Sequence, residues 1–131
     1  MDAIRLTLIV IRSGHLEAMA AFYGALGVRF VRHRHGTGPE HLSAEVDGGV
    51  VFESYPRKPG DESTMATRIG FGVNSVDEAC TSVAKAGGRI VSVPKIGEWG
   101  LRAVVDDPEG HRVELTQRKS NADGSSALHD I

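Results

Sequence analysis

Apolar positions recur at helical spacing in two segments of the chain that lie sixty residues apart. The spacing i, i+3, i+4, i+7, i+10 places the apolar side chains of each segment on one face of a helix. The two sets are Leu16, Met19, Ala20, Tyr23 and Leu26, and Val76, Ala79, Cys80, Val83 and Ala86. Gly27 and Gly87 follow these faces and are predicted to end both helices, because glycine takes positive φ without strain. Ser75, with Glu78 three residues later, forms a capping box that is predicted to begin the second helix.

Strand-like patterns surround each of the two helices. The predicted elements are a strand at 4–12, a helix at about 15–26 and strands at 29–35, 41–46 and 49–55, followed by a strand at 67–73, a helix at about 76–86 and strands at 89–93, 101–106 and 111–117. Asp47-Gly48-Gly49 and Asp107-Pro108-Glu109-Gly110 have the residues that tight turns require. The pattern therefore predicts two copies of one βαβββ unit.

The repeat also predicts how the chain is organised. We expect a single domain over 1–118, with module 1 at about 4–56, a linker at 57–66 and module 2 at about 67–118. The segment 56–62 contains two prolines, a glycine and alternating charges, which favours a loop between the modules. Residues 119–131 are rich in Ser, Asn, Asp and Gly and are predicted to form a flexible tail.

One helix can cover only one face of a small sheet, so the other face of each module remains open. The predicted fold is α+β, with two βαβββ modules forming an eight-stranded, half-open, barrel-like sheet with the helices outside. A ligand is expected on the concave inner face of this sheet. Because an open sheet face and free strand edges would gain from a partner, we expect a homodimer, and exchange of modules between the two chains is one arrangement of it.

Composition and charge narrow the range of partners. The chain has 131 residues, is 40% hydrophobic and 24% charged, and carries a formal net charge of −2, which excludes a broad basic surface for nucleic acid or anionic membrane. Apolar runs such as 8–11 are too short to span a bilayer. The single cysteine excludes an internal disulfide framework and fits a cytoplasmic protein.

Strand alternation predicts which side chains line the inner face, because successive residues point to opposite sides of a sheet. In the last strand of each module, Phe52 and Val113 are expected to pack beneath the helix. Glu53 and Glu114 then lie at equivalent positions of the two open faces. In the first strand of module 2, Arg68 is expected to point to the same side, so three charges converge on one cavity.

Two motifs are similar to those of a known superfamily. They are the first-helix segment Leu16-Glu17-x-x-x-Ala21-Phe22-Tyr23-x-x-Leu26-Gly27 and the ending Trp99-Gly100-x-Arg102 … Asp107-Pro108-Glu109-Gly110-His111-x-x-Glu114-Leu115. Together with the βαβββ repeat they resemble the vicinal oxygen chelate superfamily, which includes glyoxalase I, extradiol dioxygenases, methylmalonyl-CoA epimerase, and fosfomycin and bleomycin resistance proteins. The resemblance covers about residues 4–118 and does not distinguish among these activities.

The resemblance implies one metal ligand in the first strand and one in the last strand of each module. Glu53 and Glu114 match the last-strand positions, whereas the first-strand positions are Leu8, or Thr7 in a shifted register, and Arg68. Leucine has no donor atom and a guanidinium has no free lone pair, so neither side chain ligates a metal. We therefore hypothesise that Arg68 takes the place of the metal and pairs with Glu114, Glu53 or an anionic ligand, since two facing carboxylates repel each other.

The candidate site residues fall into two groups. They are Glu53 and Glu114 as catalytic groups, and Arg68, His41, Trp99 and Tyr55 as ligand-binding groups. Each has a structural alternative: sheet carboxylates for the glutamates, an ordinary ion pair for Arg68, and a strand-edge anchor rather than a pocket wall for Trp99. His33 and His35 have an i, i+2 spacing that either binds a metal or leaves both solvated. His111 falls next to the packed face and is predicted to be structural.

The predicted function is small-molecule binding or resistance, of the glyoxalase and bleomycin-resistance group, without the usual catalytic metal site and with no cofactor expected. One alternative is a metal-dependent lyase, isomerase or dioxygenase that binds a divalent metal through Glu53, Glu114 and His41. Another is a metal-free enzyme that uses Glu53 or His41 as general base while Arg68 orients an anionic substrate. In each case the partner is a small molecule, with no nucleic acid and no membrane.

Overall fold

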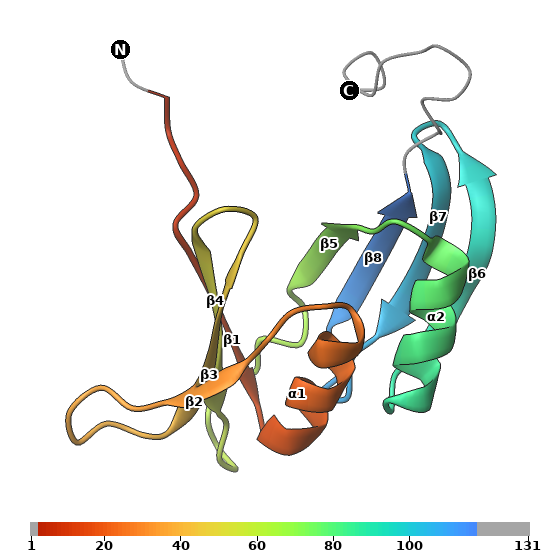
Figure 1. Ribbon diagram of the computed structural model, residues 1–131. Helices are drawn as coiled ribbons and strands as arrows, with labels where there is room; N and C mark the ends of the chain where they lie inside the picture. Colours follow the sequence, from red (N-terminus) through yellow and green to blue (C-terminus); the bar gives the residue numbers. More distant parts are fainter. Residues whose placement is uncertain (1–2, 118–131) are drawn as a thin grey trace.

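The computed structural model of the protein describes residues 3–117 (Figure 1). Module 1 consists of β1 (Leu8–Ser13), α1 (Leu16–Ala25), β2 (Val31–His33), β3 (His41–Val46) and β4 (Val50–Pro56), and module 2 consists of β5 (Arg68–Gly72), α2 (Val76–Lys85), β6 (Arg89–Gly97), β7 (Gly100–Asp106) and β8 (Arg112–Gln117). The α+β class and the two βαβββ modules are confirmed. The tail predicted at 119–131 lies outside the described residues.

The two modules have the same sheet topology. Each sheet has four strands, in the orders β1-β4-β3-β2 and β5-β8-β7-β6, and in each the first strand runs parallel to the last while the other pairs are antiparallel. Among the described residues, no strand of one sheet is hydrogen-bonded to a strand of the other. The eight predicted strands therefore form two four-stranded sheets within one chain.

The helices lie in a core that both modules share, rather than on the outside of a continuous sheet. Tyr23 of α1 packs edge-on against Phe52 of β4, with ring centroids 5.2 Å apart, and also approaches Phe71 of β5 at 6.1 Å. α1 lies beside α2, and a single cluster of buried apolar residues includes both helices and both sheets (Figure 1). The open faces of the two sheets consequently point away from this core, on the outside of the molecule.

The composition of α1 explains this arrangement. In the segment Leu16–Ala25 the one charged residue is Glu17, and Met19, Phe22 and Tyr23 are completely buried. The apolar face of α1 packs into the shared core, while Glu17, Ala21 and Gly24 on its other side are exposed. α2 keeps Asp77, Glu78 and Lys85 on its exposed side and buries Val76, Cys80 and Val83.

A buried polar network also joins the modules. The Tyr23 hydroxyl of α1 donates a hydrogen bond to Oδ2 of Asp107, 2.7 Å away, in the β7–β8 turn. Nδ1 of His111 lies 2.9 Å from the same oxygen, and its Nε2 lies 2.7 Å from the hydroxyl of Thr64 in the linker. His111 is completely buried, so the prediction of a structural role for it agrees with its position.

None of the helices in residues 3–117 is long and apolar enough to cross a membrane.

Candidate functional site

The alternation predicted for the last strand of each module holds in the structure. Phe52 and Val113 are buried beneath the helices, at 1% and 0% exposure. Glu53 and Glu114 each point to the open face of their own sheet, the face that no helix covers. The two glutamates occupy equivalent places, because Glu53 is the register partner of Val10 in β1 and Glu114 that of Gly70 in β5. Within one chain they nevertheless lie on different outward-facing sheets.

Two arginines hold the carboxylate of Glu114. Nε of Arg68 donates to Oε2 at 2.6 Å, and Oε1 accepts from Nε of Arg102 at 2.9 Å, with Nη2 of Arg102 at 2.7 Å. The hydrogen bond from Arg102 and then that from Arg68 lower the pKa of Glu114 against the opposing effect of partial burial. Glu114 is therefore an ionised carboxylate at neutral pH whose charge is already compensated.

The same open face carries more guanidinium groups than carboxylates. Arg112 and Arg89 both donate to the carboxylate of Asp106, at the end of the sheet next to Arg68. The open face of module 2 thus presents four arginines and two carboxylates, listed as Arg68, Arg89, Arg102 and Arg112 with Asp106 and Glu114. An excess of positive charge with free N–H donors is a surface that binds an anion.

The open face of module 1 is chemically different. The ring of His41 stacks on that of Tyr55 with centroids 4.0 Å apart and an interplanar angle of 8°, and its Nε2 lies 3.3 Å from Oε2 of Glu53. Beside them, Leu8 and Val10 of β1 are 51% and 40% exposed. This face therefore combines a buried His–Glu pair with an exposed apolar strip.

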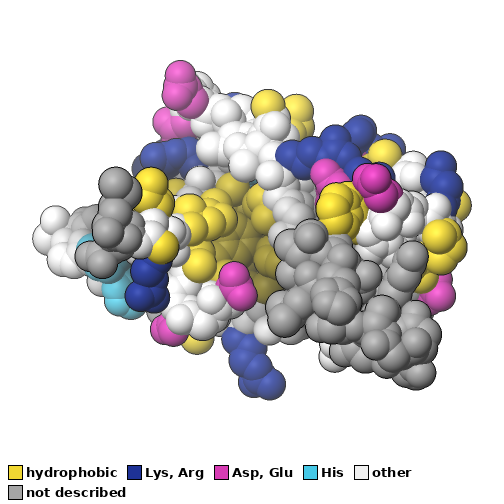
Figure 2. All heavy atoms as spheres, turned by 90° about the horizontal axis from the view of Figure 1, so that it is seen from above, with side chains coloured by type: hydrophobic (Ala, Val, Ile, Leu, Met, Phe, Trp, Pro, Cys, Tyr) yellow, Lys and Arg dark blue, Asp and Glu magenta, His cyan; other side chains and the backbone are white. Residues whose placement is uncertain are grey.

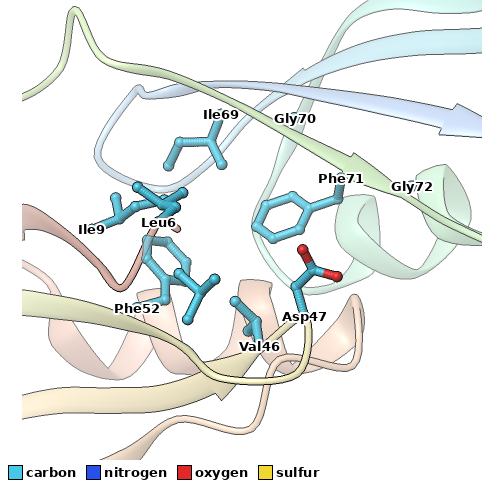
Figure 3. A pocket seen from close by; sticks show the side chains of 10 residues that line it. Leu6, Ile9, Val46, Asp47, Phe52, Ile69, Gly70, Phe71 and Gly72 are labelled. Carbon is cyan, nitrogen blue, oxygen red and sulfur yellow. The ribbon is translucent and has the colours of Figure 1, made fainter. Parts of the chain in front are cut away.

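A separate cavity of about 520 Å³ lies between the modules, on the helix-covered sides of the sheets. Figure 2 shows it from above as a hollow lined by hydrophobic side chains, and Figure 3 shows Ile9 and Phe52 of module 1 opposite Ile69 and Phe71 of module 2. The carboxylate of Asp47 stands near Phe71 at its rim. Sequence patterning placed the ligand on the open faces and missed this cavity, because it arises only from the packing of the two modules against each other.

The structure brings some of the predicted site residues together and separates others. Glu53, His41 and Tyr55 form one cluster on module 1, and Arg68 pairs with Glu114 on module 2. Trp99 lies apart from both groups, 59% exposed in the β6–β7 turn.

Arg102 also contacts Glu114, and the sequence pattern was not used to predict this contact. It belongs to the quoted motif Trp99-Gly100-x-Arg102, and strand alternation alone could have found it. Val104 is the register partner of Glu114 and Arg102 is two residues earlier, so both point to the open face. The sequence signal for Arg102 is weak, because a solvent-facing arginine on a strand indicates a site only when the residue that it pairs with is known.

Comparison with known proteins places this arrangement in a family. Residues 5–115 match the family described as the Glyoxalase/Bleomycin resistance protein/Dioxygenase superfamily. The chain belongs to this superfamily. This confirms the resemblance carried by the repeat and by the Asp107–Leu115 motif.

This chain is similar to members of the superfamily that have different described roles. It is 29% identical to the lactoylglutathione lyase of Salmonella typhimurium, over 92% of this chain and 98% of the relative. A glyoxalase-related enzyme from Fulvimarina pelagi is 26% identical with a TM-score of 0.69, covering 92% of this chain and 95% of that one. TnmS3, an antibiotic binding protein from Streptomyces sp. CB03234, is 20% identical with a TM-score of 0.71, covering 91% and 99%, and this likeness concerns the fold alone.

The metal site that the superfamily resemblance implies does not fit the residues of this chain. At the first-strand positions Leu8 offers no donor atom, and Arg68 is a cation already bonded to Glu114 at 2.6 Å. A guanidinium in that place repels a divalent cation and occupies the carboxylate that would bind it. The observed contact agrees with the hypothesis that Arg68 pairs with Glu114. Arg102 donates to the same carboxylate.

Proposed function

We propose that the protein binds a small organic anion on its open sheet faces and does not use the metal-dependent chemistry of its lyase relatives. The observation that carries the proposal is the carboxylate of Glu114 held between Arg68 and Arg102. In this arrangement fixed guanidinium groups compensate the charge that a metal would otherwise compensate. The site is then built to recognise a ligand rather than to polarise one.

The geometry of Arg68 leaves it able to bind a ligand while it stays paired. In the described part of the chain, its hydrogen bond to Glu114 uses Nε, and its side chain is 49% exposed. The guanidinium group has five N–H donors in a planar fork, so its terminal nitrogens remain available to a carboxylate, sulfonate or phosphate. These nitrogens are the proposed anion-binding atoms.

The apolar part of the ligand is proposed to lie against module 1 of a second chain. One chain turns the two open faces away from each other, so a site that uses both requires a homodimer. In the proposed dimer the exposed apolar strip of Leu8 and Val10 in one chain would face Arg68 in the other. The expected ligand class is an amphipathic anion with an apolar or aromatic body.

Binding of the fluorescent anion 8-anilinonaphthalene-1-sulfonate tests this function. Arg68→Gln is expected to raise the Kd about tenfold, because a hydrogen bond to a charged group contributes about 1.5 to 3 kcal/mol. Glu114→Gln is expected to lower the Kd, because it removes a negative charge from the site. The matched control is Arg29→Gln, which changes an exposed arginine in the loop before β2. Equal Kd values for all three variants would overturn the proposal.

The competing function is metal-dependent lyase activity, which the relatives named lactoylglutathione lyase favour. It is tested with the hemithioacetal of methylglyoxal and glutathione, with Zn²⁺ or Ni²⁺ added. We expect no metal-stimulated turnover from the wild-type protein. Turnover that depends on added metal and disappears in Glu114→Gln would replace the proposed function with lyase chemistry.

A further inference from the structure

Three histidines gather at the outer end of module 1, and none of them lies on the first or last strand, where the family resemblance implies metal ligands, although His41 adjoins Glu53 of the last strand. They are His33 in β2, His35 just after it and His41 at the start of β3. His33 and His41 are register partners across the antiparallel pair, so their side chains project from the same face. One ring nitrogen of each of the three lies within 4.8 Å of the others, and histidine side chains are visible at this end of the molecule in Figure 2.

The rings are arranged around His41. The ring of His35 stacks on that of His41 with centroids 5.1 Å apart, and His33 contacts His35 and His41 edge-on at 4.4 and 5.4 Å. Imidazole nitrogens grouped this closely can serve together as ligands of one metal ion.

His41 is held as metal-binding histidines usually are. Its side chain is 1% exposed and lies against Tyr55, and its Nδ1 is 3.2 Å from the carbonyl oxygen of Pro39. Donation from Nδ1–H to a backbone carbonyl sets the tautomer and leaves the lone pair of Nε2 available. Within residues 3–117 this buried Nε2 has no hydrogen-bond partner, although Oε2 of Glu53 lies 3.3 Å away. A buried polar atom without a partner costs free energy unless a ligand satisfies it.

The neighbouring arginines do not occupy the cluster. Arg32 pairs with Glu40 and Glu17, and Nη1 of Arg34 donates to the carbonyl of Gly38. Oε2 of Glu53 lies 3.3 Å from Nε2 of His41, and a carboxylate at this place favours a bound cation.

We propose that His33, His35 and His41 bind one divalent transition-metal ion, with Glu53 as the adjacent carboxylate. Imidazole ligands suit Zn²⁺, Ni²⁺ and Cu²⁺ and do not suit Mg²⁺ or Ca²⁺. Ligand atoms in a tetrahedral zinc site lie about 3.3 Å apart, given metal–ligand distances of about 2.0 to 2.1 Å. The exposed side chains of His33 and His35 can rotate to close the remaining distance, while the buried His41 stays in place.

The test is a Zn²⁺ titration of the full-length protein, freed of any affinity tag and treated with a chelator, by isothermal calorimetry. Wild-type protein is expected to bind one Zn²⁺ per chain. The double variant His33→Asn/His35→Asn, which changes two exposed residues and leaves the core intact, is expected to bind about tenfold more weakly or worse. His15→Asn, an exposed histidine outside the cluster, is the matched control and is expected to bind like wild type. Substitution by Co²⁺ should give a visible ligand-field spectrum that the double variant loses.

Two results would overturn the proposal. One is the absence of stoichiometric Zn²⁺ binding by the wild-type protein. The other is binding that survives in the double variant and is lost in Glu114→Gln, which would place the metal at the positions that the family resemblance implies. The proposal is independent of anion binding at Arg68, which is measured with a different probe and different variants.

Discussion

At the scale of single residues, Asp107 has the most connected side chain of the described residues. Its Oδ1 accepts from the backbone N–H groups of Glu109, Gly110 and His111, and its Oδ2 accepts from Tyr23. Burial acts to raise the pKa of Asp107, but the hydrogen bonds from His111 and Tyr23 outweigh it and hold the pKa below the usual value. Burial, together with the charge of Asp107, raises the pKa of Tyr23, which therefore stays protonated and donates.

Tyr23→Phe tests the value of this link between the modules. The substitution keeps the aromatic packing and removes only the hydroxyl that binds the charged Asp107. We expect the free energy of unfolding to fall by about 1.5 to 3 kcal/mol, measured by urea denaturation. Tyr55→Phe is the control, because the ring of Tyr55 stacks on His41 through its face. Equal losses in the two variants would show that the Tyr23 hydroxyl contributes nothing specific.

The pH dependence of stability follows from Glu114. Its folded-state pKa lies below the ordinary value of 4.5, so its ion pairs stabilise the protein above that pH and this contribution is lost as the pH falls through the folded-state pKa. We expect Glu114→Gln to lose less stability than wild type between pH 6 and about pH 3. The measurement is the urea midpoint as a function of pH, and parallel curves for the two proteins would contradict the ionised, paired state of Glu114.

At the scale of elements, the two helices are stabilised in different ways. The hydroxyl of Ser75 accepts a hydrogen bond from the backbone N–H of Glu78 at 3.1 Å, as the capping box predicts, and two acidic residues lie in the first turn of α2. His15 occupies the N-cap of α1, and no described side chain caps that end. α1 thus depends on burial, and α2 depends on capping and charge.

Ser75, the N-cap of α2, and Ser82, within α2, give a matched pair of substitutions. Ser75→Ala removes the cap and is expected to lower the free energy of unfolding by about 1 kcal/mol. Ser82→Ala makes the same chemical change at an exposed interior position, where alanine has the higher helix propensity and a small gain in stability is expected. The measurement is thermal unfolding followed by circular dichroism. A loss in Ser82→Ala as large as that in Ser75→Ala would remove the capping explanation.

At the scale of the whole molecule, the outward-facing open sheets leave apolar side chains in solvent. Leu8 and Val10 of the edge strand β1 are 51% and 40% exposed, and Val31 of the opposite edge strand, β2, is 61% exposed. Exposed apolar side chains at the edges of an open sheet favour an interface with a partner. This supports the expected homodimer in which module 1 of one chain covers module 2 of another.

The dimer is tested by light scattering coupled to size-exclusion chromatography. Wild-type protein is expected to have the mass of two chains, and Val10→Glu is expected to have the mass of one, because a buried unpaired charge at an interface is strongly unfavourable. Ile4→Glu, at a completely exposed position, is the control and should remain dimeric. A wild-type protein that has the mass of one chain at micromolar concentration would contradict the prediction.

Much of the fold could be predicted because its information is local and periodic. The helical spacing of Leu16 to Leu26 and its repetition sixty residues later indicated both modules, and strand alternation placed Glu53 and Glu114 on the open faces. The same alternation placed Arg68 near Glu114, where the 2.6 Å contact now lies. These features depend on neighbours within a few residues or across one register.

The remaining features depend on contacts between distant elements. The sequence by itself determined the two βαβββ modules, their inner and outer faces and the absence of a metal donor at Leu8 and Arg68. Only the tertiary structure decided that Tyr23 of α1 approaches Phe71 of the other module, that Arg102 joins Arg68 on Glu114, and that His33 and His35 meet His41. The reason is physical: periodicity specifies which face of an element is apolar, whereas the partner of that face is decided by the total apolar area that packing removes from water.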